Sequence, residues 1–245
     1  NIDQSPTYLT TDEEKYGGEH GYAYDNKGGA FAAGFKPTGN TALEFNAILS
    51  DSELTLGQSP SLDALGNLVK NQAKPDENRE SRMSQLGLSW NHEVSSFWDY
   101  SVKGSHTETE RHYFWTRTPG DQSNYDGNIN YLEMQHNLHP AEWLSFNLGA
   151  SHEDSTYDGR EPRDKYAGDY TAVDFDESWH ANDLFGQAQL VFLDRSLFIN
   201  LGGRYNNHEE FDDKTVWEAS TAYLVKETGT KLHAQVATGY RTPGL

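Results

Sequence analysis

The sequence contains no cysteine, and its 19 Lys and Arg face 38 Asp and Glu, a formal net charge of −19. Without cysteine there is no disulfide framework, no thiol nucleophile and no Cys-ligated zinc. The shortage of cations excludes a general nucleic-acid binder, because phosphate contacts require clustered positive charge. No segment approaches the roughly 18–20 consecutive apolar residues that a membrane-spanning helix needs.

Catalytic motifs are also missing. The chain has no G-x-S-x-G, no H-E-x-x-H, no P-loop and no glycine pattern for dinucleotide binding. We therefore predict that the protein is not an enzyme and requires no cofactor.

Aromatic residues and glycine are plentiful on this polar background. Apolar residues form only 35% of the chain, yet it holds 14 Tyr, 11 Phe, 6 Trp and 22 Gly. Low apolar content with high charge is typical of disorder, but disordered chains are poor in aromatics. The composition instead indicates extended β structure with one thin apolar face.

Apolar residues recur at every second position, as at Leu197, Ile199 and Leu201. Successive side chains of a strand point to opposite faces, so each such segment has one apolar and one small or polar face. The candidates often run nine or more residues, and about 9–11 tilted residues cross a bilayer. We expect the apolar faces to contact lipid, and Arg204 and Arg241, on the opposite face, to point into a lumen. The apolar series lie within 43–49, 86–90, 144–150, 197–205 and 232–240.

Short turns and long polar stretches alternate between these strands. An up-and-down barrel of the bacterial outer membrane has this arrangement, with short periplasmic turns and long outer loops. Aromatic residues near the turns, such as Trp98 and Trp143, suit a membrane interface. The fold class is predicted to be all-β, an antiparallel up-and-down transmembrane β-barrel. Its long extracellular loops are expected near 51–81, 108–127, 153–178 and 206–214.

Residues 184–245 resemble the barrel of TonB-dependent outer-membrane receptors and transporters. Those barrels often show a strand ending in G-x-R-Y, an acidic loop, T-x-W at the next strand, and a later strand ending in G-[FY]-[RK]-[AT]-P-x-L. The matching segments are Gly202/Gly203-Arg204-Tyr205, the loop 208–213, Thr215-Val216-Trp217 and Gly239-Tyr240-Arg241-Thr242-Pro243-Gly244-Leu245.

The resemblance implies a larger, plugged barrel of roughly 22 strands. Residues 1–245 show 11 or 12 strand candidates and are expected to form part of it, without the N-terminal plug domain and the C-terminal barrel strands. A complete 12-stranded barrel is the alternative, because an even number of strands can close.

The same resemblance implies active import of a scarce metal chelate across the outer membrane, driven by the TonB-ExbB-ExbD system through the plug. An iron-siderophore is the first expectation, and cobalamin or haem is the alternative within the family. A passive porin or a surface adhesin is the alternative of another class. A soluble β-sandwich or propeller would require the apolar faces to be covered by protein.

Two groups of residues are candidate binding sites. Arg111, Tyr113, Trp115 and Arg117 interleave cations with aromatics in an expected outer loop, and this pattern suits an anionic aromatic chelate. The alternative interpretation is the upper aromatic girdle of the barrel. Asp174, Asp176 and Glu177 could supply oxygen ligands to a loop-bound calcium ion, although no EF-hand spacing is present and solvation of a charged loop is the default.

Overall fold

The computed structural model describes residues 23–55, 61–62, 68–69, 78–114, 122–164 and 169–240. Every regular element in these ranges is a β-strand, and none of them holds a helix of the length and apolarity required to span a membrane. In chain order the strands are β1 (Ala23–Thr38), β2 (Thr41–Thr55), β3 (Ser61–Leu62), β4 (Leu68–Val69), β5 (Asn78–Ser95), β6 (Trp98–Phe114), β7 (Gln122–Ala141), β8 (Leu144–Asp164), β9 (Asp169–Phe192), β10 (Leu197–His208), β11 (Lys214–Val225) and β12 (Thr230–Ala237).

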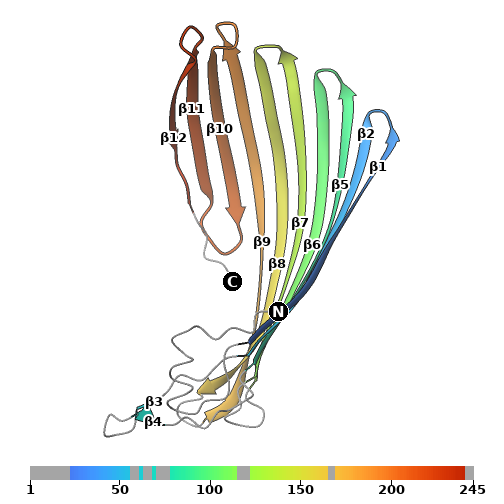
Figure 1. Cartoon of the computed structure of the whole chain (residues 1–245), viewed down its shortest axis with the longest axis vertical. Coiled ribbons are helices and arrows are strands. Elements are labelled where there is room, and N and C mark those ends of the chain that lie inside the picture. Colours follow the sequence, from blue (N-terminus) through green and yellow to red (C-terminus); the bar gives the residue numbers. More distant parts are fainter. Residues whose placement is uncertain are drawn as a thin grey trace.

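Ten of these strands form one curved antiparallel sheet in the order β1-β2-β5-β6-β7-β8-β9-β10-β11-β12 (Figure 1). Each strand therefore pairs with the next long strand of the chain, as in an up-and-down barrel. Strands β3 and β4 form a separate two-stranded ladder. The antiparallel up-and-down arrangement is confirmed. The main sheet of the described part has ten strands, fewer than the 11 or 12 candidates expected, and β3 and β4 lie outside it.

The predicted loop ranges 108–127 and 153–178 consist mostly of strand continuations. Strand β8 runs to Asp164 and β9 begins at Asp169, so little of 153–178 connects them. The same holds at the ends of the ranges 51–81, 108–127 and 206–214. The predicted boundaries were too wide because polar residues occupy both faces there. The alternation of hydropathy then disappears, although the backbone ladder continues.

The two faces of the sheet show the reverse of the burial seen in a soluble protein. On one face, here called the outer face, Leu88, Leu132 and Val236 expose 57%, 54% and 55% of their surface. On the opposite inner face, Ser151 and Asp183 expose only 7% each. No second layer of described residues covers the outer face, since the strands pack against their neighbours in the sheet. The predicted outward orientation of the apolar series is confirmed, and a soluble sandwich is excluded because its apolar face would be buried.

The apolar band of the outer face ends at a similar level on successive strands. Toward the distal end of β7, the next residue on the same face after Leu132 is Asn130. On β9, the next residue after Leu184 is likewise Asn182. Beyond the band, β5 to β9 continue with polar residues on the outer face and with polar and aromatic residues on the inner face. This region, here called the distal extension, is visible where β8 and β9 pass the ends of β10 and β11 (Figure 1). Strand β9 has 24 residues, more than twice the roughly 9–11 that cross a bilayer. The distal extension therefore projects into water.

Candidate ligand-binding site

Four aromatic rings meet on the inner face of the distal extension, each from a different strand. Tyr113 of β6 lies 5.8 Å from Tyr125 of β7, and Tyr125 stacks on Tyr157 of β8 at 6.1 Å between ring centroids. Phe175 of β9 lies 5.8 Å from Tyr157 and 6.3 Å from Tyr125. These four residues, here called the inner aromatic cluster, offer ring surface on the side of the sheet away from the apolar band.

Cross-strand register and glycine explain why the rings come together. Gly159 pairs with both Tyr125 and Phe175, so it lies between them on the same face. A side chain at Gly159 would overlap the Phe175 ring, and the missing Cβ lets that ring lie against the backbone. Gly127, opposite Tyr157, similarly leaves room beside Thr109. Glycine in a strand commonly marks such a close approach.

The hydroxyls of Tyr125 and Tyr157 remain protonated at neutral pH. Burial, and then the hydrogen bond that Tyr125 donates to the Glu161 carboxylate, raise the pKa of Tyr125 to about 12. Burial also raises the pKa of Tyr157, while the nearby positive charge of Arg111 acts in the opposite direction. A neutral phenol can donate a hydrogen bond to an oxygen of a bound ligand.

A second group of rings continues this surface toward β10. His208, 5% exposed, lies between Trp179 of β9 and Phe211, with ring centroids 4.6 and 4.8 Å away. On the outer face of the same rim, Glu209 forms an ion pair with His180 at 2.8 Å. The connection from β10 to β11 is therefore attached to both faces of β9.

The predicted ligand residues are placed only in part. Arg111 pairs with Tyr125, and Tyr113 belongs to the inner aromatic cluster, so these two lie together on the inner face. Trp115 and Arg117 lie outside the described residues. Sequence reasoning missed Tyr125, Tyr157 and Phe175. The spacing of Tyr125 to Gly127 and of Tyr157 to Gly159 was a usable signal, but only the register shows that the rings meet.

The structure does not bring the three predicted metal ligands together. Asp174 and Asp176 point to the outer face and Glu177 to the inner face, because strand β9 continues through all three. Asp174 instead pairs with Arg160 at 3.8 Å. Within the described ranges, no group of three or more acidic or histidine side chains has an arrangement suited to a metal ion. The three carboxylates therefore do not share one face of the strand, and loop-bound calcium stays a prediction.

Within the membrane-spanning band, the inner face carries paired charges. Lys103 contacts Glu133 at 3.2 Å, and Glu133 also accepts a hydrogen bond from Tyr131. Asp183 forms an ion pair with Arg204 and accepts hydrogen bonds from Asn206 and Ser151. The predicted inward orientation of Arg204 is confirmed, whereas Arg241 lies outside the described residues. These bonds join β6 to β7 and β8 to β10 across a polar wall.

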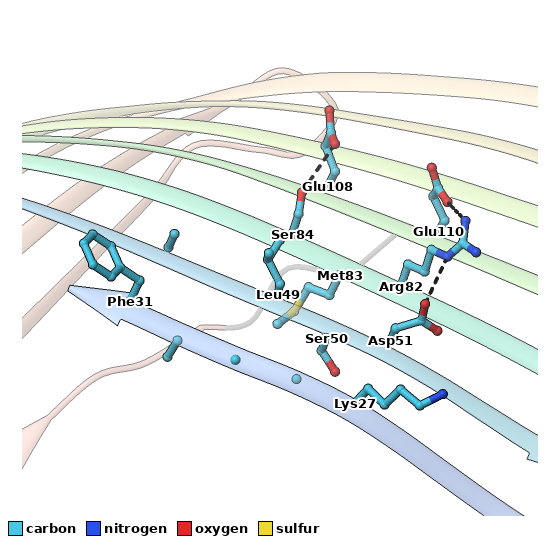
Figure 2. Close-up of a pocket in the computed structure, with 14 residues that line it drawn as sticks. Lys27, Phe31, Leu49, Ser50, Asp51, Arg82, Met83, Ser84, Glu108 and Glu110 are labelled. Carbon is cyan, nitrogen blue, oxygen red and sulfur yellow. Dashed lines mark hydrogen bonds and ion pairs between the residues drawn. The ribbon is translucent and has the colours of Figure 1, made fainter.

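A groove on the outer face marks the edge of the apolar band nearest the distal extension, close to β1. Figure 2 shows Phe31 and Leu49 at its apolar side, and Asp51, Arg82 and Glu110 linked across β2, β5 and β6 at its polar side. Arg82 lies 3.5 Å from Asp51 and 3.9 Å from Glu110. This groove is the transition from lipid-facing to water-facing side chains and lies on the face opposite the inner aromatic cluster.

Histidines occupy the same boundary on β6 and β8. His106 forms hydrogen bonds with Asn130 at 2.7 Å and Glu108 at 3.1 Å, and His152 repeats the arrangement with Asn182 at 2.8 Å and Asp154 at 3.0 Å. The pKa of each histidine is raised, first by the asparagine hydrogen bond and also by the adjacent carboxylate.

Comparison with solved structures supports the barrel fold. Similar structures include the ferric yersiniabactin uptake receptor FyuA from Yersinia pestis, with a TM-score of 0.69 and 13% identity over 91% of this chain and 40% of that one. The ferripyoverdine receptor of the Pseudomonas aeruginosa outer membrane has a TM-score of 0.66 and 16% identity over 86% and 35% of the chains. The ferric preacinetobactin receptor BauA from Acinetobacter baumannii has a TM-score of 0.64 and 9% identity over 87% and 39%.

The chain spans between 35% and 40% of the length of these three receptors. No curated protein sequence matches it significantly. The model of the family described as TonB dependent receptor-like, beta-barrel matches residues 5–245. An exposed apolar face, a polar inner wall and this match lead to one assignment. The chain belongs to the TonB-dependent receptor β-barrel family, whose members are receptors of the bacterial outer membrane and not enzymes.

Proposed function

We propose that this barrel captures a metal chelate, most specifically an iron-siderophore, and serves its active import across the outer membrane. The observation that carries the proposal is the inner aromatic cluster, flanked by Arg111, on the inner face of the distal extension. In this family the distal extension corresponds to the extracellular side, since short turns face the periplasm. The cluster then lies where a ligand arriving from outside first meets the lumen.

The chemistry of the cluster suits a chelate that carries planar aromatic groups. Aromatic pairs contribute about 0.5–1.5 kcal/mol each beyond the area they bury. The rings of Tyr125 and Tyr157 can stack on an aromatic chelating group, and a guanidinium at Arg111 can contact its anionic oxygens. Binding and release involve no bond making, so the protein needs a shaped surface and not a catalytic group.

The family supplies the remaining parts of the proposal. Several similar structures are receptors for ferric chelates, and this likeness supports a chelate as cargo. We propose that energy comes from the TonB-ExbB-ExbD system acting through a plug domain that occupies the lumen. The paired charges at Lys103–Glu133 and Asp183–Arg204 would then form part of the wall that faces the plug.

Calorimetry on the purified full-length receptor tests the proposal. Ferric catecholate and hydroxamate chelates, cobalamin and haem are titrated into the wild type and into the double variant Tyr125→Ala with Tyr157→Ala. We expect a ferric chelate to bind and the double variant to weaken that binding at least about tenfold, because two stacking surfaces are lost.

The control is Tyr223→Ala, which removes an exposed tyrosine from the outer face. It should leave affinity unchanged. Tight binding of cobalamin or haem in place of every ferric chelate would contradict the siderophore assignment, and unchanged chelate affinity in the double variant would contradict the site.

A further inference from the structure

We infer that the ligand of the inner aromatic cluster is zwitterionic, a chelate whose planar aromatic group lies between an anionic group and a cationic group. The inference rests on the proposed function and specifies its ligand class. It comes from the arrangement of charge around the cluster, which is cationic on the side of β5 and β6 and anionic on the side of β8 and β9.

The cationic end consists of Arg79 and Arg111. Arg79 of β5 pairs with Tyr113, and Arg111 of β6 pairs with Ser81 and Tyr125, so both arginines lie on the inner face. Among the described residues, neither guanidinium has a carboxylate within ion-pair distance. Arg111 is exposed and Arg79 is half-buried. Two adjacent positive charges therefore face the lumen.

The anionic end consists of Glu161 and Glu177. Glu161 of β8 accepts the hydroxyl hydrogen bond of Tyr125, and Glu177 of β9 pairs with Tyr157 in the register. Both carboxylates are exposed on the inner face, and no lysine or arginine of the described ranges forms an ion pair with them. Since neighbouring strands are about 4.8 Å apart, the strands of Arg79 and Glu161 are roughly 14 Å apart.

Three other strand arginines are neutralised within the sheet. Arg82 contacts Asp51 and Glu110, Arg160 contacts Asp174, and Arg204 contacts Asp183. The sheet thus has neighbouring strands that can pair opposite charges, yet around the cluster the two signs are kept on separate sides of the tyrosines. Charged side chains that have no ion-pair partner among the described residues are available to a ligand.

This arrangement discriminates between ligands by charge distribution. An aromatic chelate that stacks on Tyr125 and Tyr157 would place an anionic oxygen toward Arg79 and Arg111 and an ammonium toward Glu161 and Glu177. A chelate with only negative groups would meet repulsion at the carboxylates. Exposed ion pairs are each weak, so the preference should be modest and should decline with added salt.

The test uses two matched probes on the full-length receptor. The first is the ferric complex of 2,3-dihydroxybenzoyl-lysine, which carries catecholate, carboxylate and ammonium groups, and the second is the ferric complex of its Nε-acetyl derivative, which lacks the ammonium. We expect the wild type to bind the first about fivefold more tightly at low salt, since each exposed ion pair contributes little. The variant Glu161→Gln with Glu177→Gln should bind both probes equally.

A second variant, Arg79→Gln with Arg111→Gln, should weaken both probes by a similar factor and keep the preference for the ammonium. Migration of unheated samples in a denaturing gel checks that each variant is a folded barrel. Equal binding of the two probes by the wild type would overturn the inference of a zwitterionic ligand while leaving chelate capture intact. Binding of neither probe, nor of any ferric chelate, would instead reject the proposed function as well.

Discussion

The outer and inner faces of this sheet are built from the same strands but follow opposite rules. Leu88 and Val236 stand exposed on the outer face, whereas Ser151 and Asp183 are covered on the inner face. In water the outer face would be unstable, because exposed contiguous apolar surface is rare on soluble monomers. The difference shows that solvent, and not packing between protein layers, determines which residues each face carries.

The largest test of this comparison is a charge on the lipid-facing side. Leu88→Arg should destabilise the barrel in lipid by about 2–4 kcal/mol, because an arginine near the bilayer centre is poorly solvated. Equilibrium unfolding of the full-length receptor from liposomes measures this change. The matched control is Ser89→Arg, the next residue on the inner face, where the new guanidinium would lie between Glu44 and Lys103, and Lys103 already pairs with Glu133. An equal loss of unfolding free energy in the two variants would show that both faces contact the same solvent.

Removing one partner of a polar contact on the inner face should lower the free energy of unfolding by a smaller amount. Asp183→Asn leaves Arg204 without its ion pair and should destabilise the barrel by about 1–3 kcal/mol, the range for removing one partner of a buried polar contact. The same unfolding experiment measures it. A double-mutant cycle with Arg204→Gln isolates the pair, and a coupling energy near zero would contradict its structural role.

A methyl group inserted under the inner aromatic cluster compares a closely packed glycine of the inner face with an open glycine of the outer face. Gly159→Ala should displace the Phe175 ring and destabilise the distal extension by roughly 0.5–1.5 kcal/mol, the cost of an off-rotamer side chain. Gly104→Ala is the control, since its Cβ meets only the Tyr131 carbonyl oxygen at 3.8 Å. Hydrogen exchange of the β8 and β9 amides measures the change, and equal protection in both variants would argue against the close packing.

The smallest effect concerns the histidines at the boundary of the outer face. Because the pKa of His106 and of His152 is raised, their contribution to stability is complete below about pH 6.5 and is lost as pH rises through the folded pKa. Titration of the imidazole signals by NMR should place both above the usual value. Asn130→Ala and Asn182→Ala should lower the respective pKa. An unshifted value in the wild type would mean that the hydrogen bonds with asparagine are absent in solution.

Sequence reasoning recovered the fold where one face met lipid. Alternation at Leu197, Ile199 and Leu201 placed these side chains on the outer face, and the inward orientation of Arg204 followed from it. The same reasoning failed beyond the band. There both faces meet water, so hydropathy no longer distinguishes a strand from a loop, and the end of β8 and the start of β9 were predicted as a long loop over 153–178.

The candidate site was recovered only in part for a related reason. Arg111 and Tyr113 were found because they are close in sequence, whereas Phe175 reaches Tyr125 only through two strand pairings. The candidate metal ligands show the opposite relation between sequence and space. Asp176 and Glu177 are adjacent in sequence. Because successive side chains of a strand point to opposite faces, the two carboxylates lie on different sides of the sheet.

The sequence by itself determined that the chain forms long antiparallel strands with one lipid-facing side, because a period of two in hydropathy is a local property of each strand. Only the tertiary structure decided which rings and charges share the inner face of the distal extension. That outcome depends on register, and shifting a strand by one residue would turn Tyr125, Tyr157 or Phe175 to the other face.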